Sequence, residues 1–76
     1  MRTSNISLRL GLLLETKGIS QKELSRISGV SDSNISRVIR GQWNLSSDSI
    51  IKIVDATNVS PSWLLGYGDD EDMERM

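Results

Sequence analysis

Residues 18–41 carry start and stop signals for two short helices, and this stretch constrains the fold more than any other part of the chain. Ser20 and Glu23 have the spacing of a capping box, in which the serine hydroxyl accepts from the Glu23 amide and the Glu23 carboxylate reaches back to the Ser20 amide. Gly29 can adopt the left-handed conformation at which helices stop. We therefore predict a helix over 21–28 that is followed by a sharp turn.

A second helix is predicted directly after this turn. Ser31 can cap its first turn and Gly41 marks its end, so the helix is expected to span 32–40. Arg37 and Arg40 fall in its last turns, where cations suit both the helix dipole and a polyanionic partner. The two helices and the turn between them have the pattern of a helix-turn-helix.

A longer helix is predicted over 5–17, ahead of this pair. Apolar residues recur there at helical spacing on one face. That face consists of Ile6, Leu10, Leu13 and Leu14. Leu8 and Leu12 widen it, and we expect them to pack against the last helix of the domain. Gly18 ends this first helix.

Two more helices are predicted after the pair. Ser46 caps the first of them, which runs to Asn58, a residue type that tolerates the left-handed stop. Ser60 caps the second, and Pro61 occupies its first position, where a missing N–H is not needed. No stretch alternates apolar and polar residues with β-branched enrichment, so the predicted fold class is all-α with five helices.

Composition narrows the function classes. The chain has 76 residues, enough for one small domain, and it contains no Cys and no His. These absences remove a disulfide framework, the usual zinc ligands and the common nucleophile and base pairs of enzymes. No apolar run reaches the roughly 18 residues that span a bilayer. We expect a cytoplasmic protein that is not an enzyme, holds no cofactor or metal and has no membrane partner.

Charge is divided unevenly along the chain. Residues 1–68 carry eight Lys or Arg and five Asp or Glu, whereas residues 69–76 carry one basic and five acidic residues. We therefore divide the chain into a mildly basic helix-turn-helix domain over 1–68 and an acidic tail or linker over 69–76, which is expected to be solvated. The acidic segment is consistent both with a longer parent chain that has a further C-terminal domain and with a complete small protein.

Together, these signals resemble the XRE-like helix-turn-helix family, which includes phage Cro and repressor proteins. The resemblance covers residues 5–66 and rests on Ser-Gln-Lys-Glu-Leu, Gly-Val-Ser, Ile-Ser-Arg, Arg-Gly and Val-Ser-Pro-Ser-Trp-Leu-Leu. It implies a compact five-helix repressor-like bundle. It also implies sequence-specific binding of double-stranded DNA by a transcriptional regulator, a repressor of phage, prophage or bacterial origin.

In that family the second helix of the motif enters the major groove, and the first helix lies across the DNA backbone. The positions that the resemblance assigns to base reading are Asp32, Ser33, Ser36 and Arg37. Arg37 is the best candidate, because a guanidinium can bond both O6 and N7 of guanine. Asp32 can accept from a cytosine amino group, or it can simply stabilise its helix through the dipole, and the sequence leaves both roles open.

Residues around the ends of the two helices are assigned to phosphate contacts, which position a domain without reading sequence. They are Gln21, Ser31, Asn34, Arg40, Gln42 and Asn44. For Gln42 and Asn44, a role as ordinary loop residues fits equally well. Trp43 lies in the same loop, where it can cover the edge of the core, pack on the DNA backbone or join a dimer interface.

A DNA-binding domain of this size is expected to act as a homodimer, with two recognition helices about 34 Å apart on a palindromic operator. Trp63 and Leu64 are assigned to the core. The remaining candidates for the dimer interface are Leu65 and Tyr67. The alternative function is a protein-interaction module on the same scaffold, such as an antitoxin-like or adaptor domain, which the modest basic charge and Asp32 favour.

The chain departs from the family at two positions. The resemblance leads us to expect an Arg and a Glu where this chain has Leu14 and Ile39. Replacing a buried ion pair by apolar side chains removes the cost of desolvating two charges. We hypothesise that Leu14 and Ile39 touch and hold the second helix of the motif against the helix over 5–17.

Overall fold

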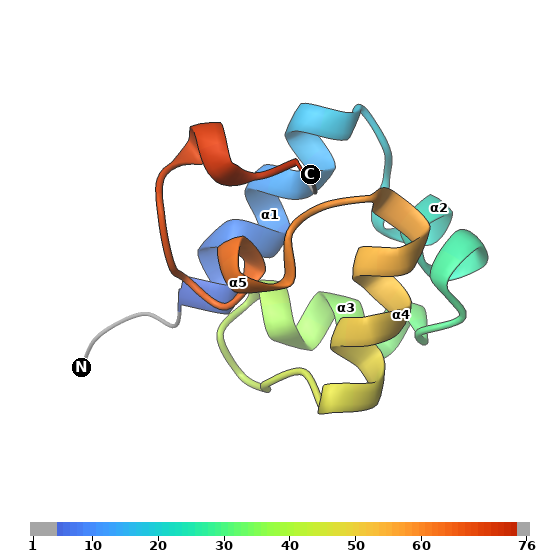
Figure 1. The fold of residues 1–76 in the computed structure, drawn as a ribbon. Coiled ribbons are helices and arrows are strands. Elements are labelled where there is room, and N and C mark those ends of the chain that lie inside the picture. The colour runs from blue at the N-terminus through green and yellow to red at the C-terminus, as the bar shows by residue number, and fades with distance from the viewer. Residues whose placement is uncertain (1–4, 75–76) are drawn as a thin grey trace.

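Five α-helices and a short 3₁₀ turn make up the domain in a computed structural model, which describes residues 5–74 (Figure 1). The elements are α1 (Asn5–Lys17), α2 (Gln21–Ser28), α3 (Asp32–Ile39), α4 (Ser47–Thr57), α5 (Pro61–Leu64) and the 3₁₀ turn η1 (Asp70–Asp72). One isolated bridge joins Val59 to Glu74. The prediction of an all-α bundle whose α2 and α3 form a helix-turn-helix is therefore confirmed.

Most of the predicted helix ends are confirmed by hydrogen bonds and backbone angles, but α3 ends at Ile39, one residue before the predicted end at Arg40. Each of the four helices after α1 begins with a serine whose hydroxyl accepts from the backbone N–H three residues on. These caps are Ser20, Ser31, Ser46 and Ser60. Gly29, with φ of 83°, and Asn58, with φ of 61°, take the left-handed conformation after α2 and α4. Local chemistry thus sets where these helices start and stop.

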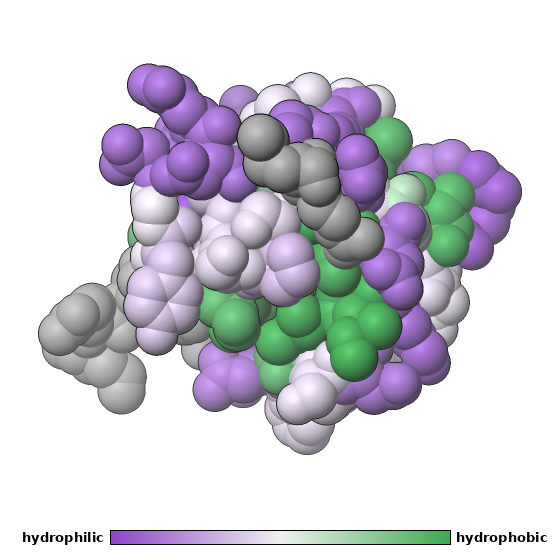
Figure 2. Space-filling view, in the orientation of Figure 1, coloured by the Kyte–Doolittle hydropathy of each residue, from purple (hydrophilic) through white to green (hydrophobic). Residues whose placement is uncertain are grey.

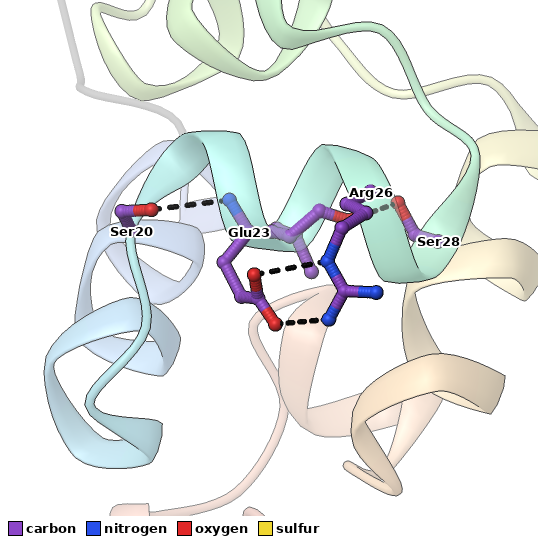
Figure 3. Close-up of polar contacts among 5 residues, drawn as sticks. Ser20, Glu23, Arg26 and Ser28 are labelled. Carbon is purple, nitrogen blue, oxygen red and sulfur yellow. Dashed lines mark hydrogen bonds and ion pairs between the residues drawn. The ribbon is translucent and has the colours of Figure 1, made fainter.

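One half of the predicted capping box is wrong. Figure 3 shows the Ser20 hydroxyl accepting from the Glu23 amide, as expected, at 3.1 Å. The Glu23 carboxylate, however, accepts from Arg26, whose Nε lies 3.1 Å from Oε1 and whose Nη2 also donates to Oε2. A guanidinium one turn along offers two donors in a fork that matches the carboxylate, which the backbone amide does not.

This contact has a measurable consequence for Glu23. The hydrogen bond from Arg26 lowers the pKa of the Glu23 carboxyl below its ordinary value, and the same bond raises the pKa of Arg26. Because the carboxyl has the lower pKa in the folded state, its stabilising contribution is present above the ordinary glutamate pKa and is lost as the pH falls through the folded value. An NMR titration of the Glu23 side chain is expected to show this lowered midpoint, and Arg26→Ala should return it to the ordinary range. An ordinary midpoint in the unaltered chain would contradict the contact.

The core draws apolar side chains from every helix. Among residues 5–74, nine apolar side chains are buried to below 2% exposure: Leu10, Leu13, Leu24, Ile35, Val38, Ile53, Val59, Trp63 and Leu64. Ile35 and Val38 anchor the inner face of α3 between α1 and α2, and the Ser7 hydroxyl donates to the Ile39 carbonyl at 2.7 Å. The opposite face of α3 is therefore turned toward solvent.

Two expectations for α1 meet different outcomes. Leu8 is 62% exposed, so the expectation that it packs against the last helix is wrong. Leu12 is partly buried against the core. The physical reason is that α5 spans only four residues and Arg9, rather than Leu8, faces it. Leu14 and Ile39 are both partly buried against the core cluster, and their direct contact stays a prediction.

Residues 69–74 fold back onto the domain, although the sequence predicts a solvated segment. The acidic side chains of η1 are exposed, but Met73 is only 5% exposed and its carbonyl accepts from the Ser60 amide at 2.6 Å. Glu74 pairs with Lys17 of α1 at 2.8 Å, so this segment runs beside α1 in Figure 1. Burial of one apolar side chain, Met73, within an acidic run is the feature that the charge pattern concealed.

Arg9 ties α1 to the end of α5. Its guanidinium donates to the carbonyls of Trp63 at 3.1 Å and Gly68 at 2.8 Å, and it lies 5.0 Å from the centre of the Trp63 ring. We expect Arg9→Met, which keeps the apolar stem, to lower the free energy of unfolding by about 1–2 kcal/mol, because the half-buried charged donors are lost. Urea denaturation measures this, and Arg9→Lys should restore only part of the loss, since an ammonium lacks the planar fork. An unchanged midpoint in Arg9→Met would show that these bonds contribute nothing.

Candidate nucleic-acid interface

The outer face of α3 forms a shallow polar hollow together with the start of α2 and the loop after α3. Seven residues line it: Gln21, Asp32, Ser33, Ser36, Arg37, Arg40 and Gln42. All four positions assigned to base reading are among them. The structure thus brings these four residues together with three of the six residues assigned to phosphate contacts.

The other three residues of the phosphate set lie outside this hollow. Ser31 uses its hydroxyl to accept from the Asn34 amide at 3.1 Å, so both residues belong to the cap of α3. Asn44 is exposed in the loop that leads to α4. Ser31 still presents the first turn of α3, where free backbone N–H groups favour an anion.

Two cations of the hollow are available to an anionic partner. Within residues 5–74, Arg37 and Arg40 are exposed and make no salt bridge with a carboxylate. Arg26 and Lys52, by contrast, each pair with an acidic residue on their own helix. A cation that is already paired loses part of its attraction for phosphate, so the two unpaired arginines dominate the field at this face.

Each of the two arginines also contacts a neighbouring side chain. Arg40 donates from Nη2 to the Ser36 hydroxyl at 2.7 Å, one turn back along α3. The guanidinium carbon of Arg37 lies 5.7 Å from the centre of the Trp43 ring. The sequence does not reveal either contact, because the second depends on the backbone at Gly41, whose φ of 78° turns the chain back toward the end of α3.

Comparison with known proteins shows which family this chain belongs to. A helix-turn-helix family model matches residues 10–64, which is more than half of the chain. The chain belongs to the XRE-like helix-turn-helix family. A similar solved structure is the crystal structure of the restriction-modification controller protein C.AhdI from Aeromonas hydrophila, with 35% identity and a TM-score of 0.75 over 82% of this chain and 94% of that one. A comparison of the sequence with curated proteins found no match.

Membership in this helix-turn-helix family makes the protein a DNA-binding transcription regulator, and it gives each element of the hollow a place in the motif. The helix that enters the major groove in such domains corresponds to α3, and the helix that lies across the backbone corresponds to α2. No helix within residues 5–74 is long and apolar enough to cross a membrane.

Proposed function

We propose that this regulator is a homodimeric repressor that inserts α3 into the major groove and reads a palindromic operator. The observation that carries the proposal is the hollow on α3, in which Arg37 and Arg40 stand beside hydroxyl, amide and carboxylate groups and, among residues 5–74, form no salt bridge. Such a mixed set of donors and acceptors matches base edges, whereas a purely basic surface would read only phosphate.

Each residue of the hollow has a role that its chemistry allows. Arg37 presents a fork of donors for O6 and N7 of guanine, and Asp32 accepts from the amino group of cytosine. Ser33 adds a weaker contact, because a hydroxyl donates and accepts and so discriminates little. Gln21, at the first position of α2, places its backbone amide toward phosphate, where the helix dipole also favours an anion. Arg40 adds a charged phosphate contact.

Dimerisation is assigned to exposed apolar side chains on α4 and in the segment directly after α5. Leu65 is 43% exposed and Tyr67 is 70% exposed, and Ile51 of α4, which sequence reasoning missed, is 57% exposed. Figure 2 shows apolar surface gathered on the side of the molecule where α4 and α5 lie. A monomer with one hollow reads too few base pairs for useful selectivity, so two copies are needed to reach typical operator affinity.

Leu65→Glu is expected to weaken the dimer by at least tenfold, because a carboxylate loses much of its hydration in an apolar interface. Sedimentation equilibrium measures the dissociation constant. Leu8→Glu is the matched control, since Leu8 is also an exposed leucine but lies on α1. Equal dimer constants for both variants would place the interface elsewhere.

Repression would result from binding of the operator, because a dimer bound where the operator overlaps a promoter excludes the polymerase. The similarity to a restriction-modification controller supports a role in transcriptional control. Selection from a pool of randomised duplex DNA at physiological salt tests the proposal. Enrichment of a two-fold symmetric site supports a dimeric reader, and a folded chain that enriches no site would favour the alternative of a protein-interaction module.

A further inference from the structure

The loop after α3 is built by a single glycine. Gly41 takes φ of 78°, and its N–H donates to the Val38 carbonyl at 3.0 Å, while the next amide, that of Gln42, donates to the Arg37 carbonyl at 2.9 Å. This pair of bonds is a Schellman motif, which reverses the chain at the end of a helix. Trp43 is the next residue, so it is carried back toward the last turn of α3.

Trp43 does not serve the core. It is 54% exposed, whereas Leu45, two residues further on, is only 9% exposed and supplies the core contact of this loop. The ring of Trp43 lies instead against Arg37, with 5.7 Å between the guanidinium carbon and the ring centre. A large apolar side chain that remains half exposed on a polar face needs another explanation than packing.

Within residues 5–74, no side chain other than Trp43 makes a polar or ring contact with the Arg37 side chain. The hydroxyl of Ser36, its neighbour in the hollow, is engaged by Arg40 at 2.7 Å. A guanidinium carbon that lies over a ring at this distance makes a cation–π contact, and such a contact uses none of the N–H donors of the guanidinium. The contact with Trp43 therefore restricts where Arg37 points without consuming the donors that would bond a base.

We propose that Trp43 is a positioning residue that holds the Arg37 guanidinium ready to read guanine. The inference rests on the proposed function, because it assumes that Arg37 contacts a base. An unsupported arginine has several rotatable bonds to fix on binding, and a contact that fixes them beforehand lowers the cost of association. Trp43 thus acts through Arg37 and controls discrimination at the base pair that Arg37 reads.

The test uses the duplex that the unaltered chain enriches from a randomised pool. Copies of this duplex carry 7-deazaguanine in place of one guanine at a time, which removes the N7 acceptor. The unaltered chain is expected to lose about fivefold or more in affinity at the guanine that Arg37 reads. Trp43→Ala should shrink this penalty by about two- to fivefold, and Trp43→Phe, which keeps an aromatic face, should restore most of it.

Three outcomes separate this inference from the proposed function. An equal 7-deazaguanine penalty in Trp43→Ala and in the unaltered chain overturns the positioning role. A uniform loss of affinity at all positions, with the penalty intact, also overturns it and assigns Trp43 to the sugar–phosphate backbone. If Arg37→Ala leaves the pattern of penalties unchanged, base reading by Arg37 itself fails. In the double variant, Trp43→Ala should cause no further change at the position that Arg37→Ala has already relaxed. Circular dichroism confirms that each variant is folded.

Discussion

Replacing Arg37 by Ala is expected to weaken operator binding by about 1–3 kcal/mol for each half-site and to relax the preference at one base pair in each. The reason is geometric, because Arg37 is exposed on α3 and free of carboxylate partners within the described residues 5–74. Its fork can satisfy both acceptors of guanine, and no residue of the hollow apart from Arg40 carries a comparable group.

Fluorescence anisotropy with the enriched duplex, and with duplexes changed at single base pairs, measures this loss. Lys52→Ala is the charge-matched control, since Lys52 lies on α4 and is paired with Asp48. A base contact predicts loss at one position per half-site, whereas a phosphate contact predicts a uniform loss and a smaller dependence on salt. A uniform loss in Arg37→Ala would move Arg37 from the base-reading set to the phosphate set.

Trp63→Ala is expected to lower the free energy of unfolding by about 3–5 kcal/mol, as is usual for a large aromatic residue removed from a core. Trp63 is fully buried and lies beneath the Arg9 guanidinium. A domain of this size has a total stability of roughly 4–11 kcal/mol, so the variant loses a large part of it. Urea denaturation followed by circular dichroism gives the change.

Two matched variants sharpen the Trp63 prediction. Trp43→Ala removes the same side chain from a half-exposed position and should cost far less stability. Trp63→Phe should cost less than Trp63→Ala, because it keeps an aromatic ring and also removes the indole N–H, which is buried without a hydrogen-bond partner within the described residues. Similar losses for the alanine variants at positions 63 and 43 would contradict the assignment of Trp63 to the core.

Local signals in the sequence predict the helix ends well. Serine caps and left-handed residues act within three or four positions along the chain, so Ser20, Ser31, Gly29 and Asn58 could be assigned from their neighbours alone. The same logic fails for the Glu23 carboxylate, because a local competitor, Arg26, offers a better donor than the backbone amide.

Contacts between distant segments could not be predicted from these local signals. The exposure of Leu8 depends on the short length of α5. The burial of Met73 depends on the backbone bridge between Val59, after α4, and Glu74. The attachment of Arg9 to the carbonyls beyond α5 joins residues more than fifty positions apart. Such pairings are set by the packing of whole helices, which no single motif encodes.

The candidate site shows the same division. Helical spacing of one and four positions places Asp32, Ser33, Ser36 and Arg37 on one face of α3, so it could be predicted that these side chains share a surface. The contact between Trp43 and Arg37 depends on how the chain turns at Gly41, and sequence reasoning offered three roles for this tryptophan without that one.

The central claim is that this chain reads DNA sequence through α3, and the ratio of its affinities for two duplexes tests it most directly. One is the duplex enriched from the randomised pool, and the other has the same composition in scrambled order. At physiological salt, we expect the enriched duplex to bind about 1,000-fold more tightly or better, as is typical of specific regulators. Equal affinities for the two duplexes, in a folded chain, would contradict sequence reading and leave only electrostatic binding to the DNA backbone.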